Sequence, residues 1–202
     1  MNSIQKLTKL FSDFPGIGPR QAKRFVYFLL TRDTYYLRDF TQTIEELKKE
    51  IALCSECFRY FPKHSKETAF CPTCADPHKD KSKLLVLARD GDFEHIEKTG
   101  VYDGYYFILG GNIPILEKDP ENKVRLRELK KKLEGGTVTE LIVAMNANPD
   151  GENTEEVIRS YIRDITEKHN ITISTLGRGL STGIELEYSD SLTLKNALEG
   201  RK

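Results

Sequence analysis

The sequence predicts a multidomain α/β protein built from successive modules. Apolar residues recur at helical spacing through the first fifty positions, and all four cysteines fall between residues 54 and 74. From residue 84 onward, strand patterns alternate with helical ones, which is typical of a mainly parallel sheet. We therefore expect domains at residues 1–53, 54–82 and 83–175, followed by a C-terminal tail at 176–202 with a short strand and a helix.

Composition narrows the function classes. The formal net charge of the 202 residues is zero, so no global field attracts nucleic acid or a membrane. The first thirty residues are nonetheless locally basic, with one acid (Asp13) against Lys6, Lys9, Arg20, Lys23 and Arg24. No apolar run approaches the ~20 residues that span a bilayer, and the N-terminus lacks an apolar signal segment. We expect a cytoplasmic protein with reduced thiols and no membrane partner.

Three helices are expected in the N-terminal region. Residues 3–12 and 19–30 are separated by a Gly- and Pro-rich turn, and Pro19 suits the first position of the second helix. The third helix should run from about residue 35 to 53. Its apolar stripe is expected to face inward: Phe40, Ile44, Leu47 and Ile51.

The turn between the first two helices, Phe14-Pro-Gly-Ile-Gly-Pro-Arg20, is a helix-hairpin-helix signature. Gly16 and Gly18 leave backbone N–H groups unobstructed, and the next helix adds its positive end, so a DNA phosphate can dock there. Further phosphate contacts are expected from the first helical turns, at Arg20, Lys23 and Arg24. Phe14 and Ile17 are interpreted as core residues under the hairpin. The alternative is a plain helical corner that uses glycine only as a cap.

The cysteines follow the spacing Cys54-x₂-Cys57-x₁₃-Cys71-x₂-Cys74, in which each pair can bind one edge of a tetrahedral ion. Four thiolates leave no open coordination position, so we expect one structural Zn²⁺ per chain. Iron in a rubredoxin-like site and two short disulfides are the alternatives. Substitute ligands are available nearby at His64 and His78, which we interpret as solvated loop residues.

The second half should contain four strands, near residues 84–87, 105–109, 140–145 and 171–175. Helices are expected at 92–99, 121–133 and 154–169, on both faces of the sheet, and a short one at about 191–199. The segment Asn146-Ala-Asn-Pro-Asp150-Gly-Glu152 follows the third strand, where sites gather in α/β sheets. Asp150 and Glu152 could hold Mg²⁺, or they could simply favour the positive end of a helix.

These motifs occur in an order that resembles bacterial RecR recombination mediators over nearly the whole chain. The resemblance rests first on the hairpin turn, Pro15-Gly16-Ile17-Gly18-Pro19, and on the four cysteines. It continues in the α/β region with Ile96-Glu97-x-Thr99-Gly100 and Asp150-Gly151-Glu152-x-Thr154. The tail adds residues 178–188, then Thr193-Leu194 and Leu198-x-Gly200-Arg201. The sequence departs from the family pattern at Ala88, where a Toprim glutamate is expected, in the long Cys57–Cys71 loop and in segment 110–119.

The resemblance implies that residues 83–175 form a Toprim domain and that the protein is a non-enzymatic DNA-repair factor with no small-molecule substrate. It would act with RecO and RecF to load RecA onto gapped or single-stranded DNA, in the bacterial cytoplasm at the nucleoid. It would assemble from dimers into a ring-shaped tetramer, with the hairpins lining the ring and the Toprim face, including Asp150 and Glu152, docking RecO.

Two alternatives to this function stay open. A Mg²⁺-dependent Toprim nuclease or primase-like enzyme needs an acid where Ala88 stands, although Asp90 or Asp92 could substitute. A zinc-stabilised scaffold without a DNA role is the other.

Overall fold

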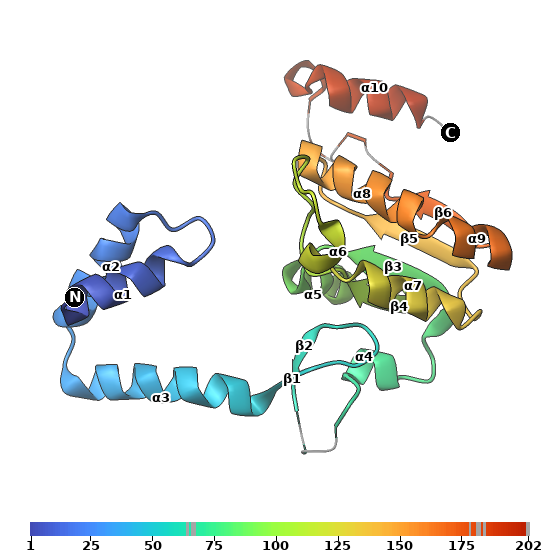
Figure 1. Ribbon diagram of the computed structural model, residues 1–202. Coiled ribbons are helices and arrows are strands. Elements are labelled where there is room, and N and C mark those ends of the chain that lie inside the picture. Colours follow the sequence, from blue (N-terminus) through green and yellow to red (C-terminus); the bar gives the residue numbers. More distant parts are fainter. Residues whose placement is uncertain (64, 66–67, 178, 181–182, 184, 201–202) are drawn as a thin grey trace. The chain divides into compact units, whose positions relative to one another are not determined.

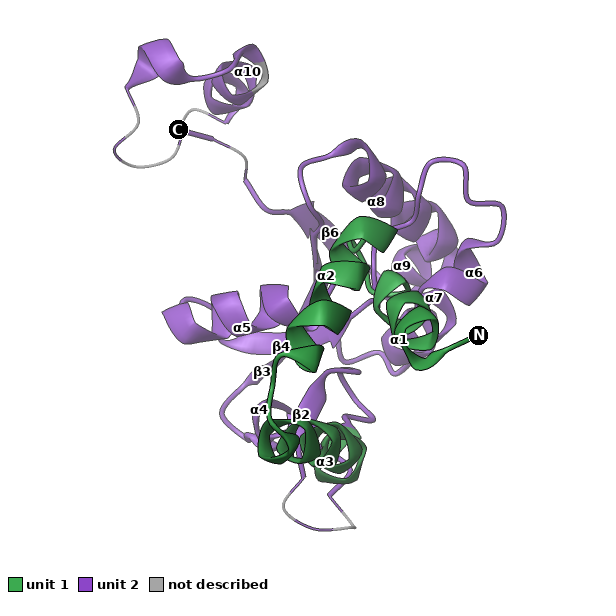
Figure 2. Ribbon diagram, turned by 90° about the vertical axis from the view of Figure 1, so that its left-hand side faces the viewer, with its two compact units in different colours: residues 1–52 green, residues 53–202 purple. Residues whose placement is uncertain are grey.

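The computed structural model describes residues 1–63, 65, 68–177, 179–180, 183 and 185–200. His64, Arg178 and Arg201 lie outside the described residues. The chain divides into two compact units, residues 1–52 and 53–202 (Figure 2). Across the described parts of both units, no helix combines the length and apolar character that crossing a membrane requires.

Unit 1 contains three helices: α1 (Ser3–Ser12), α2 (Pro19–Leu30) and α3 (Thr34–Glu50). Asn2 and Gln5 close a reciprocal capping box at the start of α1, and the Asp33 carboxylate accepts the Tyr36 N–H at the start of α3. The third helix ends at Glu50, earlier than predicted. Residues Ile51–Leu53 instead form strand β1, which pairs with β2 (Tyr60–Pro62).

The interior of unit 1 is smaller than the sequence predicts. Ala22 and Val26 of α2 are buried, but Phe14 is 56% exposed and touches Phe11 edge to face. The predicted inward stripe of α3 is also wrong, because α1 and α2 pack mainly on each other and leave this face of α3 open. Its exposed fractions are 36% for Phe40, 54% for Ile44 and 60% for Leu47.

Unit 2 is built on a four-stranded parallel sheet in the order β4-β3-β5-β6, which confirms the predicted sheet (Figure 1). The strands are β3 (Asp80–Leu87), β4 (Gly104–Ile108), β5 (Glu140–Ala144) and β6 (Thr172–Thr175). Side chains alternate between the two faces. Leu84 and Val86 belong to the core with α7 (Leu126–Glu134), α8 (Pro149–Tyr161) and α9 (Arg163–His169), whereas Leu85 and Leu87 pack with α5 (Asp90–Thr99).

Two predicted helices are each divided in the structure. The first, at 121–133, consists of α6 (Pro120–Lys123) and α7, separated by extended backbone at Val124. The second, at 154–169, begins earlier, at Pro149, and breaks at Ile162 between α8 and α9.

The described part of the tail contains a 3₁₀ turn, η1 (Leu186–Tyr188), and helix α10 (Ser191–Glu199), but no strand. The predicted short strand is therefore wrong for those residues. A strand requires a neighbouring strand to take its backbone hydrogen bonds, whereas here the Tyr188 N–H bonds locally to the Glu185 carbonyl.

Candidate metal centre and nucleic-acid interface

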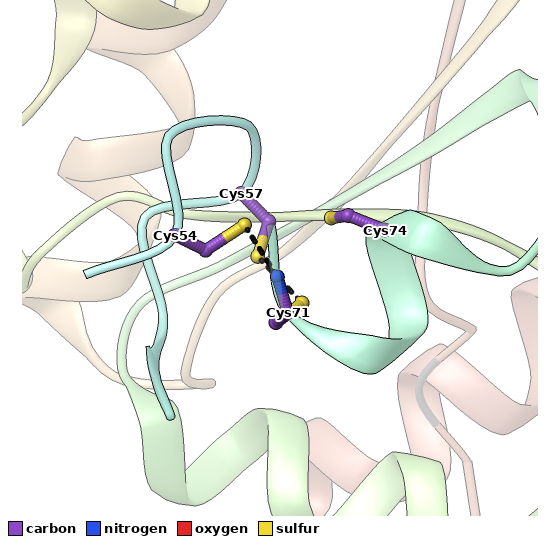
Figure 3. A group of neighbouring side chains, drawn as sticks. All are labelled: Cys54, Cys57, Cys71 and Cys74. Carbon is purple, nitrogen blue, oxygen red and sulfur yellow. Dashed lines mark hydrogen bonds between the residues drawn. The ribbon is translucent and has the colours of Figure 1, made fainter. Parts of the chain in front are cut away.

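The four cysteines form one compact donor set in unit 2. Cys54 and Cys57 lie on the turn that follows β1, Cys71 is the N-cap of α4 (Pro72–Ala75), and Cys74 lies within that helix. Their sulfurs point toward a common centre (Figure 3) and lie within 4.8 Å of one another. All four are free thiols, which argues against the disulfide alternative.

The spacing of the sulfurs fits a metal ion. The Cys57 and Cys71 sulfurs are 3.6 Å apart, and a tetrahedron with metal–sulfur bonds of about 2.3 Å has edges of about 3.8 Å. Three of the cysteines are buried and Cys74 is half-buried, so the site is closed to substrate. The Cys71 N–H donates to the Cys54 sulfur at 3.4 Å, as backbone groups around metal-bound thiolates do.

The electrostatics of the cluster favour a bound cation. The thiols of Cys57, Cys71 and Cys74 face the Cys54 sulfur and hold its pKa far below the usual range for cysteine. The thiolate at Cys54 in turn raises the pKa values of Cys57 and Cys74. Four thiolates this close together repel one another unless a cation compensates them. The donor set therefore fits a divalent metal.

The turn that carries Cys57 is attached to the sheet of unit 2. The Ile108 N–H of β4 donates to the Cys57 carbonyl at 2.8 Å. Phe58 has a positive φ of 60°, a conformation that non-glycine residues rarely adopt. Its ring packs edge to face on Phe107, with centroids 5.3 Å apart, and lies under the Arg125 guanidinium. These contacts hold the turn that carries Cys54 and Cys57 against the core of unit 2.

A second attachment joins the cysteine region to α5. The Tyr60 N–H donates to the Asp90 carboxylate at 2.8 Å, and the Arg59 guanidinium lies 4.1 Å from the centre of the Phe93 ring. Arg59 also donates to Thr73, beside the second cysteine pair. Asp90, a candidate substitute for the missing Toprim acid, therefore has a structural partner.

The other carboxylates at this edge of the sheet are not gathered. Ala88, at the end of β3, is buried, and the Asp92 carboxylate accepts the Arg89 N–H. Asp150 and Glu152 are exposed on the first turn of α8. Among the described residues, the cysteines are the one set of three or more His, Cys, Asp or Glu side chains close enough to share a metal ion.

Gly151 and Thr154, which lie next to the two acids in the sequence, have structural roles. A Cβ on Gly151 would lie 2.0 Å from the Asn146 carbonyl oxygen, so glycine is required where α8 approaches the loop after β5. The buried Thr154 hydroxyl accepts the Ile113 N–H at 2.7 Å and donates to the Asp150 carbonyl. Thr154 thus holds the divergent 110–119 segment on α8.

The hairpin of unit 1 has the geometry expected for phosphate docking. Gly16 has a φ of 76°, and Gly18 is the N-cap of α2, where no side chain of the described residues caps the helix. Three exposed cations follow on the first turns of α2: Arg20, Lys23 and Arg24. The start of α2 therefore offers open backbone N–H groups beside positive side chains.

Comparison with known proteins agrees with this arrangement. Family models match residues 4–48 (RecR, helix-hairpin-helix), 82–176 (Toprim domain) and 179–202 (RecR, C-terminal). "Recombination protein RecR" of Bifidobacterium longum subsp. infantis is 37% identical over 201 residues, covering 99% of this chain and 96% of that protein. The chain belongs to the RecR family. The RecR of Tropheryma whipplei is 33% identical over 199 residues, with 98% of this chain and 96% of that protein covered.

Family membership confirms the resemblance stated from the motifs, including the Toprim assignment. Within this RecR-family chain, the cysteine segment lies between the first two matched ranges. The residues that attach it to the Toprim domain, Phe58, Arg59 and Asp90, were not predicted from the sequence. Only the positive φ of Phe58 is unusual for its residue type, and backbone angles are not readable from a single sequence.

Proposed function

We propose that this RecR-family protein is a non-enzymatic DNA-repair and recombination mediator. It binds DNA through the hairpin of unit 1 and acts with RecO and RecF to load RecA onto gapped or single-stranded DNA, in the bacterial cytoplasm at the nucleoid. The observation that carries this proposal is the uncapped start of α2 beside exposed Arg20, Lys23 and Arg24.

The hairpin supports binding that ignores base sequence. Its open backbone N–H groups and the positive helix end attract a phosphate, and the two arginines add bidentate contacts. These groups read the backbone of DNA and not the edges of its bases. Such binding suits a mediator that acts wherever a gap occurs.

The metal site has a structural role in this proposal. Zn²⁺ held by Cys54, Cys57, Cys71 and Cys74 would supply folding energy to a segment with little regular structure of its own. The attachment of that segment to β4 and α5 would then depend on the metal.

Unit 1 also supports self-assembly into the tetrameric ring. Its helices leave an apolar hollow of about 690 Å³, lined by residues that include Leu7, Leu10, Leu30 and Ile44. An exposed hollow of this kind is typical of a surface that another chain covers. In a ring, several modest basic patches act together, so a chain of zero net charge can still hold DNA.

The Toprim domain acts in partner binding and not in catalysis. Ala88 offers no ligand, and Asp90 and Asp92 are both engaged by backbone N–H groups. The exposed carboxylates of Asp150 and Glu152 form a negative edge on which a partner such as RecO can dock.

The proposal is tested by DNA affinity and native mass. Arg20→Ala/Arg24→Ala should weaken binding of a gapped duplex, whereas Lys48→Ala/Lys49→Ala removes the same charge from the last turn of α3 and should change little. A tetramer is expected by native mass spectrometry with and without DNA. Equal affinities of the two double variants, or a stable monomer, would refute this mechanism.

A further inference from the structure

A second feature of unit 1 lies beside the hairpin. A groove of about 490 Å³ runs between α1 and α2. Ile4, Thr8 and Lys9 line it from α1, and Lys23 and Tyr27 line it from α2. Two lysines contribute to its wall, and none of the residues that line it is acidic. The groove therefore attracts an anion.

Tyr27 gives this groove an aromatic surface. The residue is 50% exposed, so part of its ring is open to an incoming group. The Lys23 ammonium lies 5.8 Å from the ring centroid, and the two residues are one helical turn apart. An open ring flanked by cations is the combination that single-stranded DNA uses, because a base stacks on the ring while its phosphates meet the lysines.

Tyr27 lies on the same side of α2 as the two arginines near the start of that helix. Arg20, Arg24 and Tyr27 are spaced at four and three residues, so they share one side of the helix. With a rise of about 1.5 Å per residue, Tyr27 lies about 10 Å along the axis from Arg20. A strand whose phosphates contact the arginines can therefore reach the groove.

We propose that the α1–α2 groove binds an unpaired base of single-stranded DNA, stacked on Tyr27, with Lys9 and Lys23 at the flanking phosphates. Bases in a duplex are already stacked on their neighbours, so the groove distinguishes single-stranded from double-stranded DNA. This inference rests on the proposed DNA binding by the hairpin and adds a preference for single-stranded over double-stranded DNA.

The chain contains no tryptophan, so a single one placed in the groove reports on stacking. The fluorescence of the Tyr27→Trp variant should be quenched by a 20-nucleotide oligothymidylate and not by a 20-base-pair duplex. Tyr35→Trp, at an 82% exposed position on α3, is the matched control and should respond to neither.

Affinity provides a second readout that does not depend on the tryptophan. Tyr27→Ala should weaken oligothymidylate binding about 5- to 150-fold per stacked base and leave duplex binding unchanged, while Tyr27→Phe should keep the wild-type affinity. An equal loss for both DNAs, or no loss, would overturn the inference.

The outcomes separate this inference from the proposed function. If the wild-type protein binds both DNAs and the Tyr27→Trp variant is not quenched, the groove inference fails and hairpin binding stands. The fluorescence of the Tyr27→Trp variant is also measured without DNA at increasing protein concentration. If the introduced indole becomes shielded from solvent as the protein concentration rises, a second copy of the chain covers the groove and the inference also fails. If the wild-type protein binds neither DNA, the proposed function itself is refuted.

Discussion

Two helices of unit 2 begin with nearly the same sequence but differ in how much space surrounds their glycine. Helix α5 begins Asp90-Gly91-Asp92, and α8 contains Asp150-Gly151-Glu152 in its first turn. At Gly91, no atom of the described residues lies within 4 Å of a substituted Cβ. At Gly151 the Cβ would meet three backbone atoms of Asn146, at 2.0, 2.9 and 3.0 Å. Alanine should therefore be tolerated at Gly91 and not at Gly151.

The loss of stability expected for Gly151→Ala follows from these contacts. Since the obstructing atoms at Gly151 are backbone, the loop after β5 must move, and overpacking of this kind costs about 3 kcal/mol. Alanine has a higher helix propensity than glycine, which offsets up to about 1 kcal/mol of this cost and leaves a net destabilisation of about 2 kcal/mol. Gly91→Ala gains the propensity without the clash, so the two variants should differ by about 3 kcal/mol.

Thermal melting followed by circular dichroism measures this difference. At about 2–4 °C per kcal/mol for a chain of this size, Gly151→Ala should melt about 6–12 °C below Gly91→Ala. If Gly151→Ala is as stable as Gly91→Ala, the close approach of α8 to Asn146 is wrong. The explanation of the Asp-Gly-Glu motif as a packing requirement would then fail.

Three further predictions concern the metal, its attachment and the acids. Metal chelation, or the Cys57→Ser substitution, should unfold the cysteine segment and reduce the oligomer mass while the sheet of unit 2 stays folded, because metal binding is coupled to folding. Proven metal loss with an unchanged oligomer mass and an unchanged melting temperature would contradict this. Asp90→Ala leaves the Tyr60 N–H without its acceptor, which should cost about 1 kcal/mol and speed thiol labelling, unlike Glu94→Ala on the same helix; equal labelling rates would argue against the attachment. Mg²⁺ should support no cleavage of nicked or single-stranded DNA, and turnover that disappears in Asp150→Ala would identify an enzyme.

Local patterns predicted most of the secondary structure and the clustering of the four cysteines. The strands of unit 2 are short apolar runs, and Leu84–Leu87 could be recognised because both faces of a central parallel strand are buried. The cysteine cluster could be predicted because the spacing of the four residues along the chain nearly determines its geometry. Gly16 and Pro19 indicated the hairpin because each suits a backbone conformation that is set locally, the positive φ of the turn and the first position of a helix.

Features that depend on distant partners were not predicted. The sequence marks Asp90 as a candidate substitute acid because its partner, the Tyr60 N–H, lies thirty residues earlier and is not visible from the local pattern. The sequence predicts a core position for Ile44, which is exposed, because helical periodicity identifies an apolar face without showing what covers it. The break at Ile162 has no Gly or Pro to mark it.

The most direct test of DNA binding by the hairpin is the salt dependence of duplex affinity. For wild type and Arg20→Ala/Arg24→Ala, the slope of log K against log salt concentration should differ by about 2 for each pair of arginines that contacts phosphate. Lys48→Ala/Lys49→Ala should keep the wild-type slope. Equal slopes for all three proteins would contradict phosphate binding at the start of α2.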